Sequence, residues 1–154
     1  MNTLAWSDVA ARLAAARNYW LHTTGPDGAP NASPVWGVAL DDDLYFYTES
    51  RTVKARNLMI DQRIVLHLES ASDVVVVHGR LHHLGHPADR PNVVNAFDQK
   101  YDRPDEAAFL PSSDDGFDTL YVLDPVSAIT WSLPDTEGST LRWARKHEVG
   151  PDAP

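Results

Sequence analysis

Cysteine is absent from the 154 residues of this chain. Its absence excludes disulfide bonds, thiolate metal ligands and a cysteine nucleophile, and it is consistent with a reducing cytoplasm. Basic residues are also scarce, because 13 Lys and Arg stand against 22 Asp and Glu, a formal net charge of −9. A broad nucleic-acid-binding surface needs clustered basic residues. We therefore expect no nucleic-acid partner.

Long hydrophobic runs are missing as well. No run approaches the roughly 18 residues of a membrane-spanning helix, and the N-terminus lacks the basic start and apolar block of a signal peptide. We expect no membrane partner and a cytoplasmic location. Hydrophobic residues make up 43% and charged residues 23%, an ordinary balance for a folded protein. This length predicts a single domain over 1–154. Within it we expect an N-terminal helix in 1–17 and a frayed tail at 150–154.

Between these ends, the pattern favours strands over helices. Apolar residues at helical spacing follow Ser7 or Asp8, either of which is a suitable helix cap. Aromatic and β-branched runs bounded by turn residues then predict strands, at 18–24, 32–40, 44–48, 64–69, 73–84, 119–123, 128–133 and 140–143. Shorter helices are expected at 52–60 and 91–101, and a loop at 103–118. Many short strands with few helices predict a mainly β fold with flanking helices, either a barrel or a sandwich.

The segment 48–58 carries the main candidate site. A predicted strand ends there, hydroxyl residues follow, and a helix begins at about Ser50 or Thr52. Free backbone N–H groups at a helix start attract anions, and Arg51, Lys54 and Arg56 add positive charge. Three of the 13 basic residues fall within six positions. The segment therefore suits a phosphate group, although an ordinary capped surface helix would have the same local pattern.

Histidine and tryptophan supply further candidates. His78, His82, His83 and His86 lie on or just after one predicted strand. His78 and His82 are separated by roughly 13 Å along a strand, too far for one ion, so we favour a polar strand face over a metal site. The five tryptophans suit either a core or stacking on a planar ring. Trp6 and Trp20 are expected in the core, and Trp36, Trp131 and Trp143 are the candidates for stacking.

Familiar catalytic motifs are missing. The chain has no Ser-His-Asp order, no nucleophile elbow and no glycine-rich nucleotide loop. Its carboxylates are scattered, so the sequence singles out no general-acid pair. No catalytic residue is assigned from these patterns.

Several motifs nevertheless resemble one known family. They are, in chain order, Thr23-x-x-x-Asp27-Gly28-x-Pro30, Ser33-Pro34-Val35-Trp36-Gly37, Leu44-Tyr45-Phe46-Tyr47-Thr48, Thr52-Val53-Lys54-Ala55-Arg56-Asn57-Leu58, Val74-Val75-Val76-Val77-His78-Gly79 and Thr140-Leu141-Arg142-Trp143. Together they resemble the split-barrel flavin and deazaflavin oxidoreductases, whose founding member is pyridoxamine 5′-phosphate oxidase. The pattern is most similar to the actinobacterial branch that uses coenzyme F420.

The resemblance implies a fold, an assembly and a set of binding residues. The fold would be a six-stranded Greek-key split β-barrel, assembled as a homodimer with two cofactor sites at the interface. Backbone groups of Val35, Trp36 and Gly37 would follow the cofactor ring. The remaining implied contacts are Tyr47 and Thr48 to the ribityl chain, Thr52, Val53 and Lys54 to the phosphate, Asn57 close by, and Trp131 and Arg142 from the partner subunit.

The implied activity is an F420-dependent reductase that transfers hydride to a small conjugated organic molecule. In such a protein the cofactor carries the chemistry, which explains why no catalytic motif is needed. The alternatives are an FMN-dependent oxidoreductase, a flavin or haem carrier without turnover, and a dimer that has lost its site. Val53 stands where the oxidases carry arginine next to the phosphate lysine. Either Arg51 or Arg56 compensates for it, or the phosphate contact is weaker. The basic residues with which the true oxidases bind their substrate are not recognisable in this sequence, so pyridoxamine phosphate oxidation is not expected.

Overall fold

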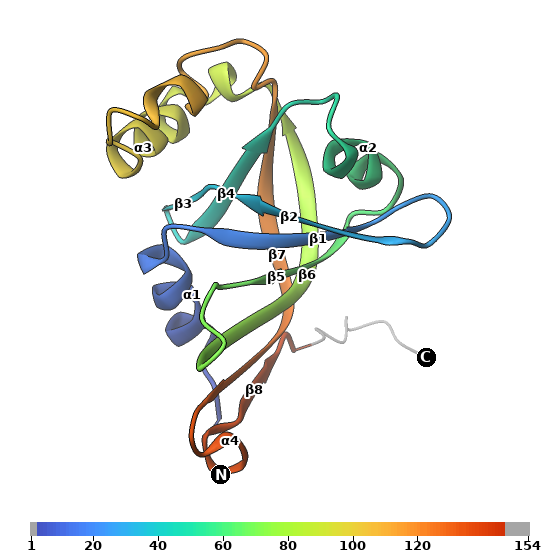
Figure 1. The fold of residues 1–154 in the computed structure, drawn as a ribbon, viewed down its shortest axis with the longest axis vertical. Helices are drawn as coiled ribbons and strands as arrows, with labels where there is room; N and C mark the ends of the chain where they lie inside the picture. Colours follow the sequence, from blue (N-terminus) through green and yellow to red (C-terminus); the bar gives the residue numbers. More distant parts are fainter. Residues whose placement is uncertain (1–2, 147–154) are drawn as a thin grey trace, which may run out of the picture.

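The computed structural model describes residues 3–146, and the predicted tail at 150–154 lies outside them. One antiparallel sheet of eight strands dominates the fold (Figure 1), in the order β2-β1-β5-β6-β7-β4-β3, with β8 also paired to β7. The strands are β1 (Tyr19–Thr24), β2 (Pro30–Val35), β3 (Gly37–Leu40), β4 (Asp43–Thr48), β5 (Arg63–His67), β6 (Asp73–Gly85), β7 (Thr119–Ser132) and β8 (Leu141–Ala144). The helices are α1 (Trp6–Ala15), α2 (Val53–Ile60), α3 (Pro91–Lys100) and α4 (Thr136–Ser139). The predicted class, mainly β with flanking helices, is confirmed, although the family resemblance implied six strands. None of the helices in residues 3–146 has the length and hydrophobicity needed to cross a bilayer.

The β6–β7 pair runs the length of the molecule and carries most other strands (Figure 1). The two strands have 13 and 14 residues, and β5 pairs with β6 while β4 and β8 pair with β7. The sequence predicted two strands around Asp124-Pro125, which is wrong. A register shift after His78 pairs Gly79 with Pro125 and leaves Val126 as an extra residue, so the strand continues past the proline.

The predicted strand 32–40 is also wrong, because the chain changes partner at Trp36. Before it, β2 pairs with β1, and after it, β3 pairs with β4. These two strands form the opposite edges of the sheet, yet a single residue joins them. The sheet must therefore curl until its edges meet at Trp36, which is how the barrel closes.

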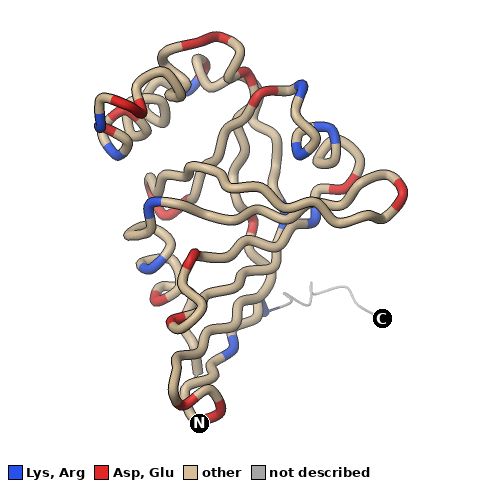
Figure 2. The backbone as a smooth tube through the Cα atoms, viewed as in Figure 1, with Lys and Arg blue, Asp and Glu red and all other residues tan. Residues whose placement is uncertain are grey.

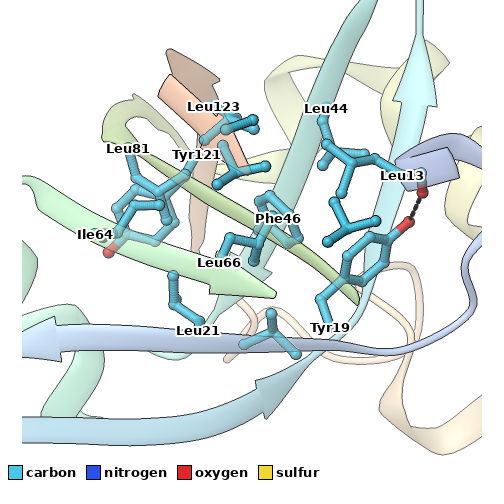
Figure 3. Close-up of a cluster of buried hydrophobic side chains, with 14 of the residues drawn as sticks. Leu13, Tyr19, Leu21, Leu44, Phe46, Ile64, Leu66, Leu81, Tyr121 and Leu123 are labelled. Carbon is cyan, nitrogen blue, oxygen red and sulfur yellow. Dashed lines mark hydrogen bonds between the residues drawn. The ribbon is translucent and has the colours of Figure 1, made fainter. Parts of the chain in front are cut away.

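The main core fills the inside of this curl (Figure 3). Leu13, Tyr19, Phe46 and Leu66 lie at its centre, each with at most 1% of its surface exposed. The Tyr19 hydroxyl donates a hydrogen bond to the Leu13 backbone oxygen at 2.5 Å, which ties the end of α1 to β1. Burial raises the pKa of the Tyr19 hydroxyl, so it stays a donor.

Two local predictions at this end of the chain fail. The helix α1 begins at Trp6, so both predicted caps, Ser7 and Asp8, lie inside it, and the N-cap is Ala5, which makes no side-chain hydrogen bond. Burial of Val9 and Leu13 rather than capping holds this helix in place. Trp20 was expected in the core, but it is 37% exposed because its neighbours Tyr19 and Leu21 point inward.

A second apolar cluster lies beneath α3. Val93 and Phe97 of this helix and the following Tyr101 are buried against Tyr47 of β4 and Leu120 of β7. The Tyr47 and Phe97 rings meet edge to face, with centroids 4.8 Å apart. The loop 103–118 follows α3 and contains one short 3₁₀ turn, Ala107–Phe109. Because the Tyr47 hydroxyl donates to the Phe109 backbone oxygen at 2.5 Å, this loop is fixed next to β4.

The close approach of Gly79 to β7 generates a stability prediction. A Cβ at position 79 would lie 2.5 Å from the Asp124 backbone oxygen. We expect Gly79→Ala to lower the free energy of unfolding by about 1–3 kcal/mol, because the backbone must shift. Urea denaturation measures the loss, with Gly116→Ala as the control, because a Cβ there meets only the Asp114 side chain. Equal stability of the two variants would contradict the prediction.

Candidate functional site

An open pocket of about 340 Å³ lies where β2 ends, β4 ends and the segment leading into α2 begins. This volume is within the usual range for small-molecule sites, at its lower end. The pocket combines aromatic walls with a polar end, and its lining residues are Asn18, Pro34, Val35, Trp36, Tyr47, Thr48, Glu49, Thr52, Lys54, Phe109 and Phe117.

Hydroxyl groups and one ammonium group form the polar end. Thr52 is the N-cap of α2, as predicted, and its Oγ1 accepts a hydrogen bond from the Ala55 N–H at 3.4 Å. The same hydroxyl donates to the Glu49 backbone oxygen at 2.8 Å and lies 3.3 Å from the Thr48 hydroxyl. These bonds fix both threonines at the end of the pocket, where their oxygens face the start of the helix.

Lys54 is half-buried beside these hydroxyls. Burial lowers the pKa of its ammonium group, and the nearby Glu49 carboxylate partly opposes that effect. Within residues 3–146, the ammonium group makes no hydrogen bond or ion pair. A partly desolvated cation without a partner is the arrangement that an anionic ligand would complete.

The aromatic wall is held by a hydrogen-bonded corner at Trp36 and Gly37. The Trp36 ring stacks on Tyr101, with centroids 4.3 Å apart and planes at 9°. The Tyr101 hydroxyl accepts from the Gly37 N–H at 2.9 Å and donates to the Arg17 backbone oxygen at 2.6 Å. Lys100 Nζ donates to the Gly37 oxygen at 2.6 Å and to the Tyr19 hydroxyl at 2.9 Å. Residues of α3 and its end therefore position Trp36.

Gly37 is required at this corner. A Cβ there would lie 2.5 Å from Cε1 of Phe46, a buried core ring on β4. Both peptide groups of Gly37 are bonded within the chain, to Tyr101 and Lys100. In this structure Gly37 thus anchors the wall of the pocket, whereas Val35 and Trp36 on its N-terminal side line it.

The structure brings together some of the predicted binding residues and separates others. Six of them line the pocket: Val35, Trp36, Tyr47, Thr48, Thr52 and Lys54. Val53 is 48% exposed and lies outside the lining, as does the buried Asn57. The Asn57 amide donates to the Thr23 hydroxyl at 3.0 Å, so this side chain joins α2 to β1.

Trp131 and Arg142 lie on other strands. Trp131 is opposite Val74 in the β6–β7 pair, and Arg142 is opposite Ile129 in the β7–β8 pair. Thr130, next to Trp131, is buried, and Leu141 and Trp143 on either side of Arg142 pack against the main core. The side chains of Trp131 and Arg142 therefore project from the outer face of the sheet. Arg142 lines a separate hollow of about 400 Å³ on this part of the chain.

The other lining residues were not assigned to the site from the sequence. Asn18 and Pro34 were not singled out, and Phe109 and Phe117 belong to a loop that carried no diagnostic motif. Two aromatic residues in a loop rich in Asp, Ser and Pro are the one signal that was available. Glu49 was also missed as a wall residue, although it stands between two residues of the predicted anion site.

The histidines on or just after β6 lie apart from this pocket. His82 Nε2 is 3.1 Å from Oδ2 of Asp124. The other carboxylate oxygen of Asp124 pairs with Arg145. His86 follows β6, and its Nδ1 accepts from the Ala88 N–H at 3.0 Å. No group of three His, Cys, Asp or Glu side chains suited to a metal ion occurs in the described part of the chain.

Comparison with known proteins shows the family of this chain. The family model described as pyridoxamine 5′-phosphate oxidase matches residues 6–130. The chain belongs to the pyridoxamine 5′-phosphate oxidase family. No curated protein matches the sequence.

Solved structures share the fold at low sequence identity. A conserved hypothetical protein from Mycobacterium tuberculosis is 21% identical with a TM-score of 0.70, over 98% of this chain and 96% of that one. A structure described as an F420 reductase is 19% identical with a TM-score of 0.61, over 77% and 93%. An FMN-binding protein from Nostoc punctiforme, described as related to pyridoxamine 5′-phosphate oxidase, is 22% identical with a TM-score of 0.59, over 89% and 85%. Proteins of this fold therefore include ones described with either cofactor.

The partly buried ammonium group of Lys100 should make the stability of the protein depend on pH. Burial, helped by the nearby Arg17, lowers the pKa of its ammonium group to about 8. In the unfolded chain the pKa is higher, so between these values the unfolded state binds more protons, and stability rises as pH rises. We expect the wild type to gain about 1 kcal/mol relative to Lys100→Met between about pH 8 and pH 10.5, after allowance for solvent screening. Urea denaturation across this range measures the difference, and parallel curves for the two proteins would contradict it.

Proposed function

We propose that this protein is an F420-dependent oxidoreductase that transfers hydride to a small conjugated organic molecule, with FMN as the alternative cofactor. Membership of the family supports a flavin-type site, and the half-buried Lys54 without a partner is the observation that supports its position. Lys54 lines the same pocket as Trp36, Thr48 and Thr52.

The residues present fit a ring system that ends in a phosphate. Lys54 would pair with the phosphate, and the Thr48 hydroxyl would donate to it. The Thr52 hydroxyl already donates its one proton to the Glu49 backbone oxygen, so its role is to hold this segment in place. Trp36 would lie beside the ring system, since Tyr101 already holds the indole in a fixed orientation. Phe109 and Phe117 would exclude water from the bound ring. The cofactor, when bound, supplies hydride chemistry, and these residues bind it, orient it and keep the site dry.

The family resemblance also implies a homodimer, and the outer face of the sheet is the surface that we propose for it. Trp20, Ile129 and Trp131 are partly or fully exposed there, on β1 and β7. Arg142 extends this surface from β8. A two-fold contact through the face would bring Trp131 and Arg142 of the partner subunit toward the pocket, which in one chain lacks both.

The Lys54 assignment generates a binding prediction. We expect Lys54→Ala to weaken F420 and FMN binding by about 1.5–3 kcal/mol, because a charge-assisted hydrogen bond is lost. Titration followed by cofactor fluorescence measures the change. Lys146→Ala is the matched control, since it removes an exposed lysine outside the pocket. Unchanged cofactor affinity in Lys54→Ala would show that this residue is not part of the site. A haem-type visible spectrum of the purified protein would contradict the proposal of a flavin-type cofactor.

A shared site generates a complementation prediction. Light scattering should give twice the 17.1 kDa of one chain. Lys54→Ala and Arg142→Ala homodimers should each bind cofactor weakly. After their subunits exchange at random, about one quarter of the sites should contain both wild-type residues and bind tightly. No recovery in samples shown to contain mixed dimers would contradict the contribution of Arg142 across the interface.

A further inference from the structure

The phosphate end of the pocket contains an acidic residue as well as a basic one. Glu49 and Lys54 both line it. The Glu49 carboxylate accepts a hydrogen bond from Arg51 Nε at 2.5 Å, and its side chain is 27% exposed whereas that of Arg51 is 84% exposed. The acidic partner thus faces the pocket, and the basic one extends into solvent. These three residues together leave one net positive charge.

The surroundings add no further positive charge inside the pocket. The first residue of α2 is the apolar Val53, which is 48% exposed. Asp118 binds the Ser50 N–H and hydroxyl at 2.8 and 2.7 Å, so a second carboxylate holds the same segment. Arg56 is exposed and does not line the pocket, because two residues along a helix rotate a side chain by about 200° away from Lys54. Figure 2 shows these basic residues on α2 and the segment before it, with acidic residues close by in the chain.

We propose that Glu49 determines which kind of phosphate the pocket accepts, a singly charged diester in preference to a doubly charged monoester. This inference rests on the proposed function, because it assumes that the pocket binds a phosphate-bearing cofactor. One net positive charge balances the single charge of a phosphodiester, as in F420. The second charge of a phosphomonoester, as in FMN, has no cation left to meet and is repelled by the Glu49 carboxylate.

The phosphate contribution is isolated by comparing FMN with riboflavin, which has the same ring and ribityl chain without the phosphate. At about pH 8 the monoester carries two charges, and below its second pKa of about 6 it carries one. In the wild type we expect FMN to bind no more than about threefold more tightly than riboflavin at about pH 8. In Glu49→Gln, FMN should gain about tenfold at that pH while riboflavin is unchanged.

Two further measurements distinguish charge from shape. The FMN gain in Glu49→Gln should shrink at about pH 5, where the phosphate is singly charged. Val53→Arg, which adds a cation beside the pocket and leaves Glu49 in place, should also favour FMN over riboflavin. Glu137→Gln removes an equal charge from α4, outside the pocket lining, and should change neither affinity.

The outcomes separate this inference from the function on which it rests. If F420, FMN and riboflavin all fail to bind the wild type, both the proposed function and the role of Glu49 are wrong. If flavins bind but Glu49→Gln and Val53→Arg leave the ratio of FMN to riboflavin affinity unchanged, only the role of Glu49 is overturned. A wild type that binds FMN far more tightly than riboflavin at about pH 8 would also overturn it.

Discussion

The β6–β7 ladder is the constraint on which the other elements depend. Its two strands pair with β5, β4 and β8, and its inward residues Val75 and Val77 belong to the main core. A proline lies within β7, so the ladder survives only because a bulge follows and Gly79 leaves room for the Asp124 carbonyl. Around this spine the sheet curls until its two edges meet at one residue, Trp36.

That meeting point links the fold to the pocket. Gly37 begins β3 at one edge of the sheet, opposite Phe46, and its N–H and C=O groups are bonded to Tyr101 and Lys100. The same contacts place Tyr101 flat against Trp36. A requirement of barrel closure, the satisfaction of one buried peptide, thereby provides a fixed aromatic wall. The helix α3 is thus part of the site although none of its residues lines the pocket.

Charged residues determine the electrostatics of the polar end of the pocket. In a chain with a net charge of −9, a strongly positive phosphate site would need several converging cations. The structure places one half-buried lysine there and sets a carboxylate beside it. A phosphate-bearing ligand bound there would depend on hydroxyl groups and on the aromatic walls for much of its affinity. This balance is compatible with a cofactor of low phosphate charge, and it distinguishes the pocket from sites built around arginine pairs.

The sequence by itself determined the mainly β class, most strand positions and a capped start of α2 at Ser50 or Thr52, because these depend on periodicity and on side chains a few residues apart. Family motifs indicated Trp36, Thr48 and Lys54 as pocket residues. Only the tertiary structure decided that the chain breaks its strand at Trp36, that Phe109 and Phe117 complete the wall, and that Asn57 turns to Thr23. Strand pairing, loop docking and the direction of a buried amide are set by contacts between residues far apart in the chain. Local sequence patterns do not specify these contacts.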